Sequence, residues 1–515
     1  MNILDTIIEK RRADIERLGL DFGIPLPAKR QRALHPFLAQ KGVILEVKRA
    51  SPSKGDISPD LDSYATAFSY AQSGARAISC LTETNYFKGT LADLMKVCRA
   101  VDDFEAQTGD PAPAVLRKDF LLSADEVEVA YRAGADAVLL IARILEKDLL
   151  LDMARTVVKL GMSALVEVRA QEDLEKLSFV FSQPDFAGLS GSKGNFVFGV
   201  NSRDLASFKI DLLHPSMMTE KIRQAVGSDA RIVFESGVTN TECAASVAAM
   251  GFSGLLLGEA AAKNPSIRKN LVDSFVNSKA TKNSEFWKNY ASSVMDSSVS
   301  LSGVSRQSSP KIKICGLTRL EDAVLAQNLG AAFTGFVFAD AFPRSLTKEG
   351  RLEKLLPAFS QIKAKKVAVI VDVTSSEAKK AIQLVKDGVL DLIQFHKVHY
   401  EDVSPELLEL PHYFATNSLE EYEKLVSKGE MRVLLDLHGD GDFSKITGDA
   451  RSSGFVYEAK WLAGGISPEN VAELVQKYKP ELVDVSGGVE DKDKNGIKNE
   501  DKVKELIKNA GAFYE

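Results

Sequence analysis

The sequence predicts an α/β protein built from two tandem (β/α)8 barrels, the first of which carries an N-terminal helical extension. Short apolar segments rich in β-forming residues alternate with helical segments along most of the chain, and eight such strands are found in each half. A Ser-rich stretch separates the two halves. A doubly wound sheet would alternate in the same way, but the strand count and the short repeating unit favour barrels.

Length and composition are those of an ordinary globular protein. At 515 residues the chain is too long for one core, and its 45% hydrophobic residues can fill several. A net charge of −6 argues against a general nucleic-acid binder, whose affinity would rest on a basic surface. The four cysteines lie far apart without a CxxC pair, so neither a disulfide framework nor a zinc site is expected, and a reducing cytoplasm fits.

The first half begins with an apolar spacing over residues 3–18 that predicts an amphipathic helix and not a signal peptide, and no apolar run is long enough to span a membrane. We expect a Pro-containing turn next, and then a second short helical stretch near residues 30–40. Strands are predicted at about 43–48, 76–81, 114–118, 136–141, 163–168, 196–200, 231–235 and 254–257. Helices between them are predicted at 62–73, 91–107, 124–133 and 146–159.

A barrel of this kind places its chemistry at the carboxyl ends of its strands, and the first half meets this demand. Glu46 and Lys48 lie two residues apart on the first strand, so they point to the same side, and a Ser/Pro/Gly loop follows. A structural ion pair is the alternative, since buried charges are usually paired. Lys118, Glu167 and Asn201 end or follow the third, fifth and sixth strands. Clustered groups of this kind can tune one another's pKa for acid–base catalysis.

Further polar residues follow the later strands. Arg203 and Asp204 come after the sixth strand and could form either a loop ion pair or part of a site. Ser236-Gly237 and Gly258 follow the seventh and eighth strands, where barrels commonly hold a phosphate on backbone N–H groups.

Four of these segments together resemble indole-3-glycerol-phosphate synthase. They are Glu46–Gly55 (EVKRASPSKG), Leu116–Phe120 (LRKDF), Asn201–Leu205 (NSRDL) and Glu235–Gly237 (ESG), and the resemblance runs from the N-terminal helices to about residue 275. The Gly/Ser-rich segment 189–195 departs from the family as an insertion before the sixth strand, and we expect it to lie away from the site.

The resemblance implies roles for particular residues. Lys118 would be the general acid and Glu167 the general base, while Glu46, Lys48 and Asn201 would orient the substrate and stabilise charge. A substrate and phosphate pocket would be lined by Ser51, Lys54, Phe87, Phe120, Arg203, Ser236, Gly237, Leu257 and Gly258.

The regular pattern dissolves between the halves. A Ser-rich linker is predicted over residues 279–309, which leaves a first domain at 1–278 and a second at 310–515. The segment Glu285–Tyr290 is more apolar than the rest, and we expect packing there, as a short helix, and not an aromatic binding box.

The second half repeats the alternation of strands and helices. Strands are predicted at about 311–315, 333–338, 366–371, 390–395, 412–415, 432–436, 459–463 and 482–486. Cys315 stands where a strand opens into a Gly-containing loop, so it could act as a thiolate base, whereas Cys80, Cys98 and Cys243 are interpreted as core residues. Glycines after the seventh and eighth strands again suit a phosphate.

These strand ends resemble phosphoribosylanthranilate isomerase over about residues 310–515. The matching segments are Lys313–Thr318 (KICGLT), Pro343–Ser345 (PRS), Leu434–Asp436 (LLD), Leu462–Val471 (LAGGISPENV) and Val483–Glu490 (VDVSGGVE).

The resemblance implies that Cys315 is the general base and Asp436 the general acid of an Amadori rearrangement, with Arg344 holding the anthranilate. It also implies substrate binding by His396, Gly464, Gly465, Asp484, Ser486, Gly487 and Gly488. The acid–base chemistry is consistent, because an acid must open the ribose ring and a base must remove the proton on the next carbon.

The second half departs from this family in two places. The Gly-rich loop that usually follows the acid is replaced by residues 437–458, which include His438 and two added carboxylates, and this puts a phosphate contact there in doubt. His438 is interpreted as a solvated loop residue. Lys397 stands where the family usually has a glycine after His396.

Together, the two resemblances imply adjacent steps of tryptophan biosynthesis on one chain. The second barrel would isomerise N-(5'-phosphoribosyl)anthranilate, and the first would close the product to indole-3-glycerol phosphate with loss of carbon dioxide and water. A synthase joined to a binding-only isomerase barrel is the alternative, and a pair of sugar-phosphate epimerase barrels is a weaker one. We expect small phosphorylated substrates, no metal or other cofactor, no nucleic acid or membrane partner, and a cytoplasmic monomer that associates at most loosely with other enzymes of the pathway.

Overall fold

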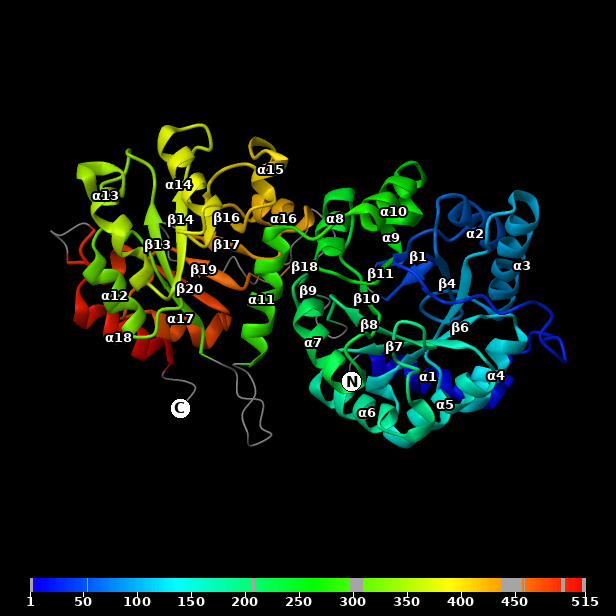
Figure 1. Ribbon diagram of the computed structural model, residues 1–515. Helices are drawn as coiled ribbons and strands as arrows, with labels where there is room; N and C mark the ends of the chain where they lie inside the picture. The colour runs from blue at the N-terminus through cyan, green and yellow to red at the C-terminus, as the bar shows by residue number, and fades with distance from the viewer. Residues whose placement is uncertain are drawn as a thin grey trace. The chain divides into compact units, whose positions relative to one another are not determined.

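The computed structural model describes residues 3–52, 54–204, 209–296, 309–437, 456–457, 459–491 and 496–511. The chain divides into two compact units, Met1–Ala280 and Thr281–Glu515. Each unit contains one closed barrel of eight parallel strands, so the predicted architecture of two tandem TIM barrels is confirmed (Figure 1).

The first barrel has the strand order β1-β11-β10-β8-β7-β6-β5-β4. Its strands are β1 (Gly42–Val47), β4 (Ala77–Leu81), β5 (Ala114–Lys118), β6 (Ala137–Ile141), β7 (Ser163–Val168), β8 (Phe196–Asn201), β10 (Ile232–Glu235) and β11 (Gly254–Leu257). All eight agree with the predicted strands to within one residue at each end. The apolar runs succeed as a signal because strands covered on both faces need apolar residues at nearly every position.

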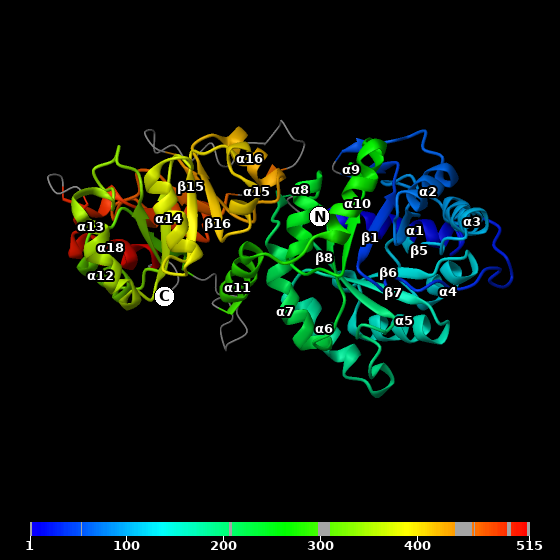
Figure 2. The same cartoon turned by 45° about the horizontal axis from the view of Figure 1, so that its top comes forward.

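Helices surround this ring of strands (Figures 1 and 2). They are α1 (Ile3–Leu18), α2 (Ser63–Gln72), α3 (Leu91–Thr108), α4 (Ala124–Arg132), α5 (Lys147–Lys159), α6 (Gln171–Phe181), α7 (His214–Val226), α8 (Thr241–Ala249), α9 (Glu259–Lys263) and α10 (Arg268–Asn277). Side chains fix several of their starts: Asp62 accepts from the Ala65 N–H at 2.7 Å to begin α2, and Thr90 accepts from the Asp93 N–H at 3.1 Å to begin α3. Short strands β2 (Ala50–Ser51) and β3 (Gly55–Asp56) pair in the loop after β1, and β9 (Lys209–Ile210) follows β8.

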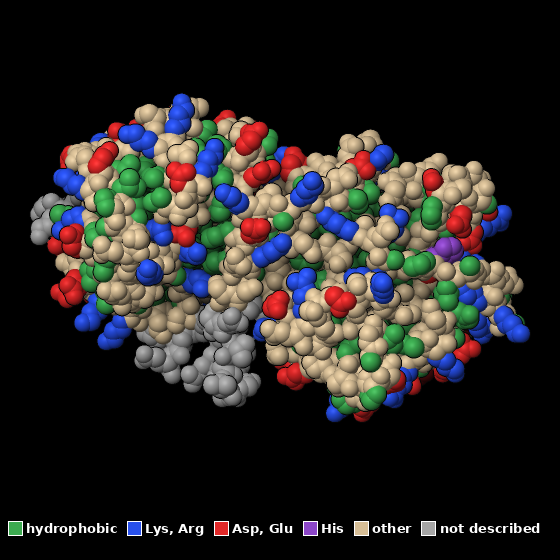
Figure 3. Space-filling view, viewed as in Figure 1, with side chains coloured by type: hydrophobic (Ala, Val, Ile, Leu, Met, Phe, Trp, Pro, Cys, Tyr) green, Lys and Arg blue, Asp and Glu red, His purple; other side chains and the backbone are tan. Residues whose placement is uncertain are grey.

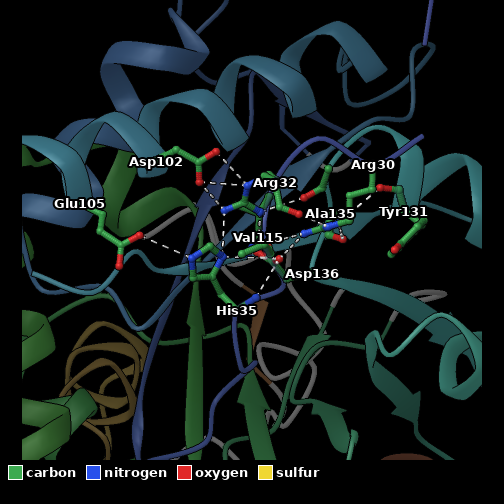
Figure 4. Close-up of polar contacts among 11 residues, drawn as sticks. Arg30, Arg32, His35, Asp102, Glu105, Val115, Tyr131, Ala135 and Asp136 are labelled. Carbon is green, nitrogen blue, oxygen red and sulfur yellow. Dashed lines mark hydrogen bonds and ion pairs between the residues drawn. The ribbon is translucent and has the colours of Figure 1, made fainter. Parts of the chain in front are cut away.

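The helical stretch predicted near residues 30–40 is wrong: this segment is irregular (Figure 4). Its polar groups bond across the barrel end and not within a helix. Arg30 donates to the Ala135 carbonyl at 2.6 Å and pairs with Asp136 at 2.6 Å, and Arg32 pairs with the same carboxylate at 2.8 Å. Pro36 follows, which disfavours a helical conformation at the preceding residue. These contacts hold the segment, here called the strap (residues 24–40), against the amino end of β6.

The strap closes the floor of the first barrel. Phe37 and Leu38 belong to the buried apolar cluster inside the barrel, with 1% and 0% of their surfaces exposed. The strands contribute the rest of this cluster, including Ile44, Leu116, Leu139, Leu165, Val197, Val233 and Leu256. The inserted segment 189–195 precedes β8, so it too lies at the amino end of the strands, away from their carboxyl ends, as predicted.

The second barrel has its strands in the order β12-β13-β14-β15-β16-β17-β19-β20. They are β12 (Lys311–Ile314), β13 (Phe333–Val337), β14 (Lys365–Ile370), β15 (Leu392–His396), β16 (His412–Thr416), β17 (Val433–Asp436), β19 (Trp461–Ala463) and β20 (Leu482–Val485). They lie within two residues of the predicted positions. The helices are α11 (Lys282–Asp296), α12 (Leu320–Asn328), α13 (Arg351–Leu355), α14 (Ser376–Lys386), α15 (Pro405–Leu408), α16 (Leu419–Ser427), α17 (Val471–Tyr478) and α18 (Glu500–Gly511), and β18 (Val456–Tyr457) is a short strand.

Helix α11 lies in the segment that the sequence predicts to be linker, and it belongs to the second unit. Its Trp287 is 1% exposed, and the ring centre lies 5.5 Å from that of Trp461, the first residue of β19. Tyr290 contacts the same indole at 5.5 Å, and the Asn283 side chain accepts a hydrogen bond from the His412 N–H at 3.1 Å. Helix α11 therefore packs at the amino end of the second barrel.

The surface carries side chains of both charges, as the small net charge of the sequence suggests. On the face drawn in Figure 3, acidic and basic side chains are interspersed and not gathered by sign. Among the described helices, none has the length and apolarity needed to cross a membrane.

Candidate active sites

In the first barrel, three predicted side chains meet at the carboxyl ends of β1 and β5, two strands that are separated by β4. Glu46, on β1, is 2% exposed; its carboxylate lies 2.7 Å from the Lys48 ammonium and 3.4 Å from the Lys118 ammonium, which comes from the end of β5. Burial alone would raise the pKa of Glu46, but the two lysines outweigh burial and lower it to about 2. The cluster is therefore a carboxylate held between two cations.

Two more carboxyl groups complete this cluster. Glu167 on β7 and Glu235 on β10 are 7% and 1% exposed. Burial raises the pKa of both groups, and the Glu167 carboxylate raises that of Glu235 further. Burial would lower the pKa of Lys118, yet the surrounding carboxylates raise it above its ordinary value. Lys118 is thus a charged proton donor beside carboxyl groups that hold protons more tightly than usual, which is the combination that acid–base chemistry needs.

Glu235 is a residue that sequence reasoning missed as a site residue. It is the last residue of β10, a position equivalent to that of Lys118 on β5, and its Oε1 has no hydrogen-bond partner in the described part of the chain. A Cβ on Gly199 of β8 would overlap this oxygen, so the glycine makes room for the carboxyl group. The rule that strand ends carry the chemistry would have found Glu235.

Asn201 ends β8 and is 8% exposed. Its side-chain oxygen accepts from the Arg203 N–H at 3.0 Å, and its carbonyl accepts from Arg169 at 2.8 Å. Arg169 also pairs with Asp204 at 3.0 Å, so the loop ion pair considered for Asp204 forms with a residue that the sequence did not suggest. These contacts hold Asn201 and Arg203 at the end of β8.

The predicted phosphate-binding residues follow β10 and β11. Ser236 and Gly237 both have positive φ, +69° and +82°. This conformation is rare for a serine and marks a position that the fold constrains. Gly258 comes directly after Leu257 on β11, and a Cβ there would lie 2.8 Å from Glu46 Oε1 and 3.0 Å from Lys48 Nζ. The end of β11 therefore lies directly against the charged cluster.

The remaining predicted residues of this site lie on loops beside the cluster. Lys54 follows β2, which contains Ser51, and pairs with Glu259 of α9 at 2.8 Å. Phe87 and Phe120 have ring centres 6.1 Å apart. The buried Glu83 orders the loop that contains Phe87. Its carboxylate accepts from the Phe87 N–H at 2.9 Å and from the N–H groups of Asn85 and Tyr86. Glu83 was not predicted.

The second barrel contains a cavity of about 580 Å³ at the carboxyl ends of its strands. All ten residues predicted for this half line it, namely Cys315, Arg344, His396, Asp436, Gly464, Gly465, Asp484, Ser486, Gly487 and Gly488. Apolar side chains of β13, β14 and the following loops line it as well, among them Val337, Phe342 and Val369. A polar rim with an apolar wall suits a ligand that has both an aromatic ring and charged groups.

Cys315 and Asp436 face this cavity from different walls. They follow or end β12 and β17, which are separated by β19 and β20, and are 9% and 7% exposed. Burial raises the pKa of the Cys315 thiol, and the neighbouring Lys313 opposes this rise. Of the other cysteines, Cys80 and Cys243 are 0% exposed and Cys98 is 4%, as expected for core residues.

A charged group fixes Arg344 at the cavity wall. Its guanidinium forms a bidentate ion pair with Glu490, at 2.9 and 2.5 Å, and Lys498 pairs with the same carboxylate at 2.6 Å. Lys498 also donates to the Ser486 carbonyl at 3.1 Å. Two cations thus share one carboxylate beside the Ser486–Gly488 loop, which leaves net positive charge next to the predicted phosphate-binding backbone.

Glycines bring the loops after β19 and β20 close to their neighbours. Gly464 has a φ of +102°, and a Cβ there would lie 2.9 Å from Asp436 Oδ1. A Cβ on Gly488 would overlap the Ile466 carbonyl. Lys397, which stands where a glycine is usual, keeps the left-handed conformation with a φ of +56°. The backbone therefore retains a glycine-like conformation at Lys397 although the residue has changed.

Three further side chains were not predicted: Gln394, which lines this cavity, and Lys313 and Tyr413, which contact Gln394. Lys313 lies two residues before Cys315 on β12 and is 0% exposed; its ammonium contacts Asp484 at 2.5 Å and Gln394 at 2.8 Å. Tyr413 donates to the same Gln394 oxygen at 2.7 Å. His438 and most of residues 437–458 lie outside the described residues. Within the described part of the chain, no group of His, Cys, Asp and Glu side chains is placed to hold a metal ion.

Comparison with known proteins gives consistent matches in each half. Residues 4–273 match the family model for indole-3-glycerol phosphate synthase, and residues 312–509 match that for N-(5'phosphoribosyl)anthranilate isomerase. The multifunctional tryptophan biosynthesis protein of Schizosaccharomyces pombe is 28% identical over 91% of this chain, which spans 59% of that relative's length. The tryptophan biosynthesis protein TRP1 of Phytophthora nicotianae is 29% identical over 85% of this chain and 86% of its own length.

Other relatives and solved structures are similar to only one half of this chain. Indole-3-glycerol phosphate synthase of Exiguobacterium sibiricum is 34% identical over 52% of this chain and 94% of its own length. A phosphoribosylanthranilate isomerase from Thermotoga maritima, of known structure, is 29% identical, covers 39% of this chain with 98% of its own, and has a TM-score of 0.32.

Proposed function

Because the chain belongs to the indole-3-glycerol phosphate synthase family and carries a phosphoribosylanthranilate isomerase domain in its second half, we propose that its two barrels catalyse consecutive reactions of tryptophan biosynthesis. The observation that carries this proposal is that each barrel gathers, at the carboxyl ends of its strands, the side chains to which we assign the acid and the base of its own reaction. In this proposal the second barrel acts first, and its product is the substrate of the first barrel.

In the isomerase barrel, Asp436 donates a proton to the ring oxygen of the ribose, and the bond between that oxygen and the anomeric carbon breaks. Cys315, as the thiolate, removes the proton from the adjacent carbon, which gives an enamine that becomes the 1-amino-1-deoxyketose. Placement of the two groups on different walls of one cavity supports this division of labour, since each proton transfer takes place on a different side of the sugar.

In the synthase barrel, Lys118 acts as the general acid and Glu167 as the general base. Lys118 supplies a proton to the carbonyl oxygen of the ketose as the new ring bond forms, and the oxygen later leaves as water. Carbon dioxide leaves from the ring carbon that bears the carboxylate. Glu46, Lys48 and Asn201 orient the substrate, and the ammonium groups that flank Glu46 balance the negative charge of substrate and enzyme.

Each barrel binds the phosphate of its substrate beyond its last two strands. In the synthase barrel Ser236, Gly237 and Gly258 offer backbone N–H groups, and in the isomerase barrel Gly464, Gly465 and the Ser486–Gly488 loop do so. In the second barrel Lys498, which donates to the Ser486 carbonyl at 3.1 Å, supports this assignment, and Arg344 holds the anthranilate. We place the protein in the cytoplasm as a monomer that uses no metal, and analytical ultracentrifugation would test the oligomeric state.

Direct assay of the two reactions tests the proposal. Lys118→Ala should reduce synthase turnover about 100-fold or more, the usual contribution of an acid–base residue, and leave isomerase turnover unchanged. Cys315→Ala should abolish isomerisation and leave the synthase reaction unchanged when its substrate is added directly. A wild-type chain without isomerase activity would support the alternative of a binding-only second barrel.

A further inference from the structure

The floor of the isomerase cavity contains a lysine whose burial needs an explanation. Lys313 is 0% exposed, and a fully buried ammonium group is costly unless it is paired and hydrogen-bonded. It lies two residues before Cys315 on β12, so both side chains point to the barrel interior. No role of Lys313 follows from the acid–base chemistry described above.

Three side chains fix the position of this ammonium group. Asp484 of β20 accepts from it at 2.5 Å and Gln394 of β15 at 2.8 Å, and Tyr413 of β16 donates to the same Gln394 oxygen at 2.7 Å. The Gln394 amide nitrogen lies 3.2 Å from His396 Nδ1 at the cavity wall, which leaves the oxygen for Lys313 and Tyr413. Four strands thus hold one cation in a defined place.

Gly335 of β13 brings the lysine and the cysteine together. A Cβ on Gly335 would lie 2.6 Å from Cys315 Sγ and 3.1 Å from Lys313 Cε, so both side chains rest against the same glycine and lie within a few ångströms of one another. Asp484 is the charged partner of the ammonium group and Gln394 is the neutral one. Burial raises the pKa of Cys315 and Lys313 lowers it; Asp484 and Lys498 contribute less, the first raising the pKa and the second lowering it.

We propose that Lys313 is a positioning residue of the isomerase centre, whose buried ammonium group, fixed by Asp484 and Gln394, stabilises the thiolate form of Cys315. The same ion pair holds Asp484, which lines the cavity. The second carboxylate oxygen of Asp484, Oδ1, is buried without a hydrogen-bond partner in the described part of the chain. One cation therefore serves the base and a substrate-facing carboxylate. This inference rests on the proposed isomerase function of the second barrel.

The alternative is that Lys313 only neutralises Asp484, as in a structural ion pair. The two possibilities differ in the titration of Cys315. A cation within about 4–6 Å shifts the pKa of an ionisable group by about 1–3 pH units, whereas a purely structural ion pair need not affect the thiol. A measurement of the thiol separates them without any assay of catalysis.

The test is the rate of alkylation of Cys315 by iodoacetamide as a function of pH, in the full chain. The other three cysteines are buried in the core, and mass spectrometry of the peptide that contains Cys315 identifies the site, with Cys315→Ser as the blank. In Lys313→Met, the midpoint of the rate profile should move to higher pH by about one unit or more. The acid limb of the isomerase pH–rate profile should move in the same direction.

Further variants keep the result interpretable. Lys366, at the start of β14, pairs with Asp391 at 3.0 Å, and Lys366→Met should leave the midpoint unchanged. Lys313→Met with Asp484→Asn also removes the carboxylate that the single variant would leave buried and unpaired. Compared with Asp484→Asn alone, since Asp484 itself raises the pKa of the thiol, the double variant carries the test if Lys313→Met does not fold. Fluorescence of Trp287 and Trp461 reports folding of the second unit.

An unchanged midpoint in a folded Lys313→Met variant, or in the folded double variant relative to Asp484→Asn alone, would overturn the proposal and leave Lys313 as a structural partner of Asp484. Failure of the proposed function would give a different result, because the wild-type chain would then lack isomerase turnover whatever the thiol titration shows.

Discussion

The first strand of each barrel carries its reactive side chains two residues apart. Glu46 lies on β1 and Lys48 directly follows it, and Lys313 lies on β12 and Cys315 directly follows it. Alternation along a strand sends both members of each pair into the barrel, where they meet groups from strands that are distant in sequence. In both barrels one member is a cation that stabilises the negative form of its neighbour. The protonation state of Glu46 or Cys315 therefore depends on the lysine two residues away as well as on the residue itself.

Glu167 should control the pH dependence of the synthase reaction. Burial raises its pKa, so the fraction of ionised base should increase across a pH range above the ordinary value for glutamate, about 4.3. Turnover should rise through that range. Glu167→Gln should reduce turnover about 100-fold or more and remove this limb of the pH–rate profile. The measurement is kcat/KM against pH.

The matched control for Glu167 is Glu175→Gln, the same substitution on an exposed residue of α6. Its profile should follow that of the wild type. If Glu167→Gln kept both near-normal turnover and the acid limb, another group would have to be the base.

Residue-level prediction named side chains where a strand end coincides with a motif, and it missed those one layer below. Cys315 and His396 were predicted, but Lys313 and Gln394, each two residues earlier on its strand, were not. Alternation alone would place Lys313 inside the barrel. Its contact with Asp484 depends on the register in which Lys313 pairs with Asp484 between β12 and β20, which a single sequence does not reveal.

At the scale of elements, the strands were predicted well and the strap was not. Strands covered on both faces show as apolar runs, whereas the strap bonds through arginine side chains to carbonyls and to Asp136. Such long-range contacts have no periodic signal. The same reasoning applies to α11, where the aromatic residues indicated packing but the Ser-rich surroundings indicated a linker.

The strap should loosen as the pH rises through the titration of His35. Asp136 raises the pKa of His35, against an opposing contribution from burial, and the ring lies 3.7 Å from the carboxylates of Asp136 and Glu105 (Figure 4). A group whose pKa is raised by folding stabilises the fold fully below its unfolded pKa, and that stabilisation is lost as the pH rises through the folded pKa. Nδ1 of the neutral ring can accept a hydrogen bond from Arg32 at 3.1 Å. Protonation of Nδ1 replaces that bond by one donated to Asp136.

Hydrogen–deuterium exchange of peptides covering residues 24–40 measures this effect. Protection of the strap, corrected for the intrinsic pH dependence of exchange, should fall as the pH rises above about 6.5, the ordinary pKa of histidine, because the pKa of His35 is raised. His35→Gln should flatten the dependence. His399→Gln, which changes a histidine with a 68% exposed side chain in the second unit, should not. A strap with equal protection throughout this range in the wild type would contradict the prediction.

At the scale of the whole molecule, each unit closes its own ring of eight strands and fills its own core, which is the usual condition for a domain to fold alone. The boundary between units was placed differently by sequence and by structure. A Ser-rich linker over 279–309 would allow a second fragment that begins near residue 306, whereas the second compact unit begins at Thr281 and includes α11. We propose that this helix is part of the isomerase domain.

Fragments 1–280 and 281–515 should each fold and keep one activity, whereas fragment 306–515 should be markedly less stable. Loss of α11 removes Trp287 and Tyr290 from Trp461, and truncation of a large buried aromatic side chain alone costs about 3–5 kcal/mol. Urea unfolding followed by tryptophan fluorescence measures this, because both tryptophans of the chain lie in the second unit. Trp287→Ala in the full chain should lower the same transition and leave the synthase reaction unchanged. Equal urea midpoints for fragments 281–515 and 306–515 would show that α11 is dispensable and that the domain begins where the sequence placed it.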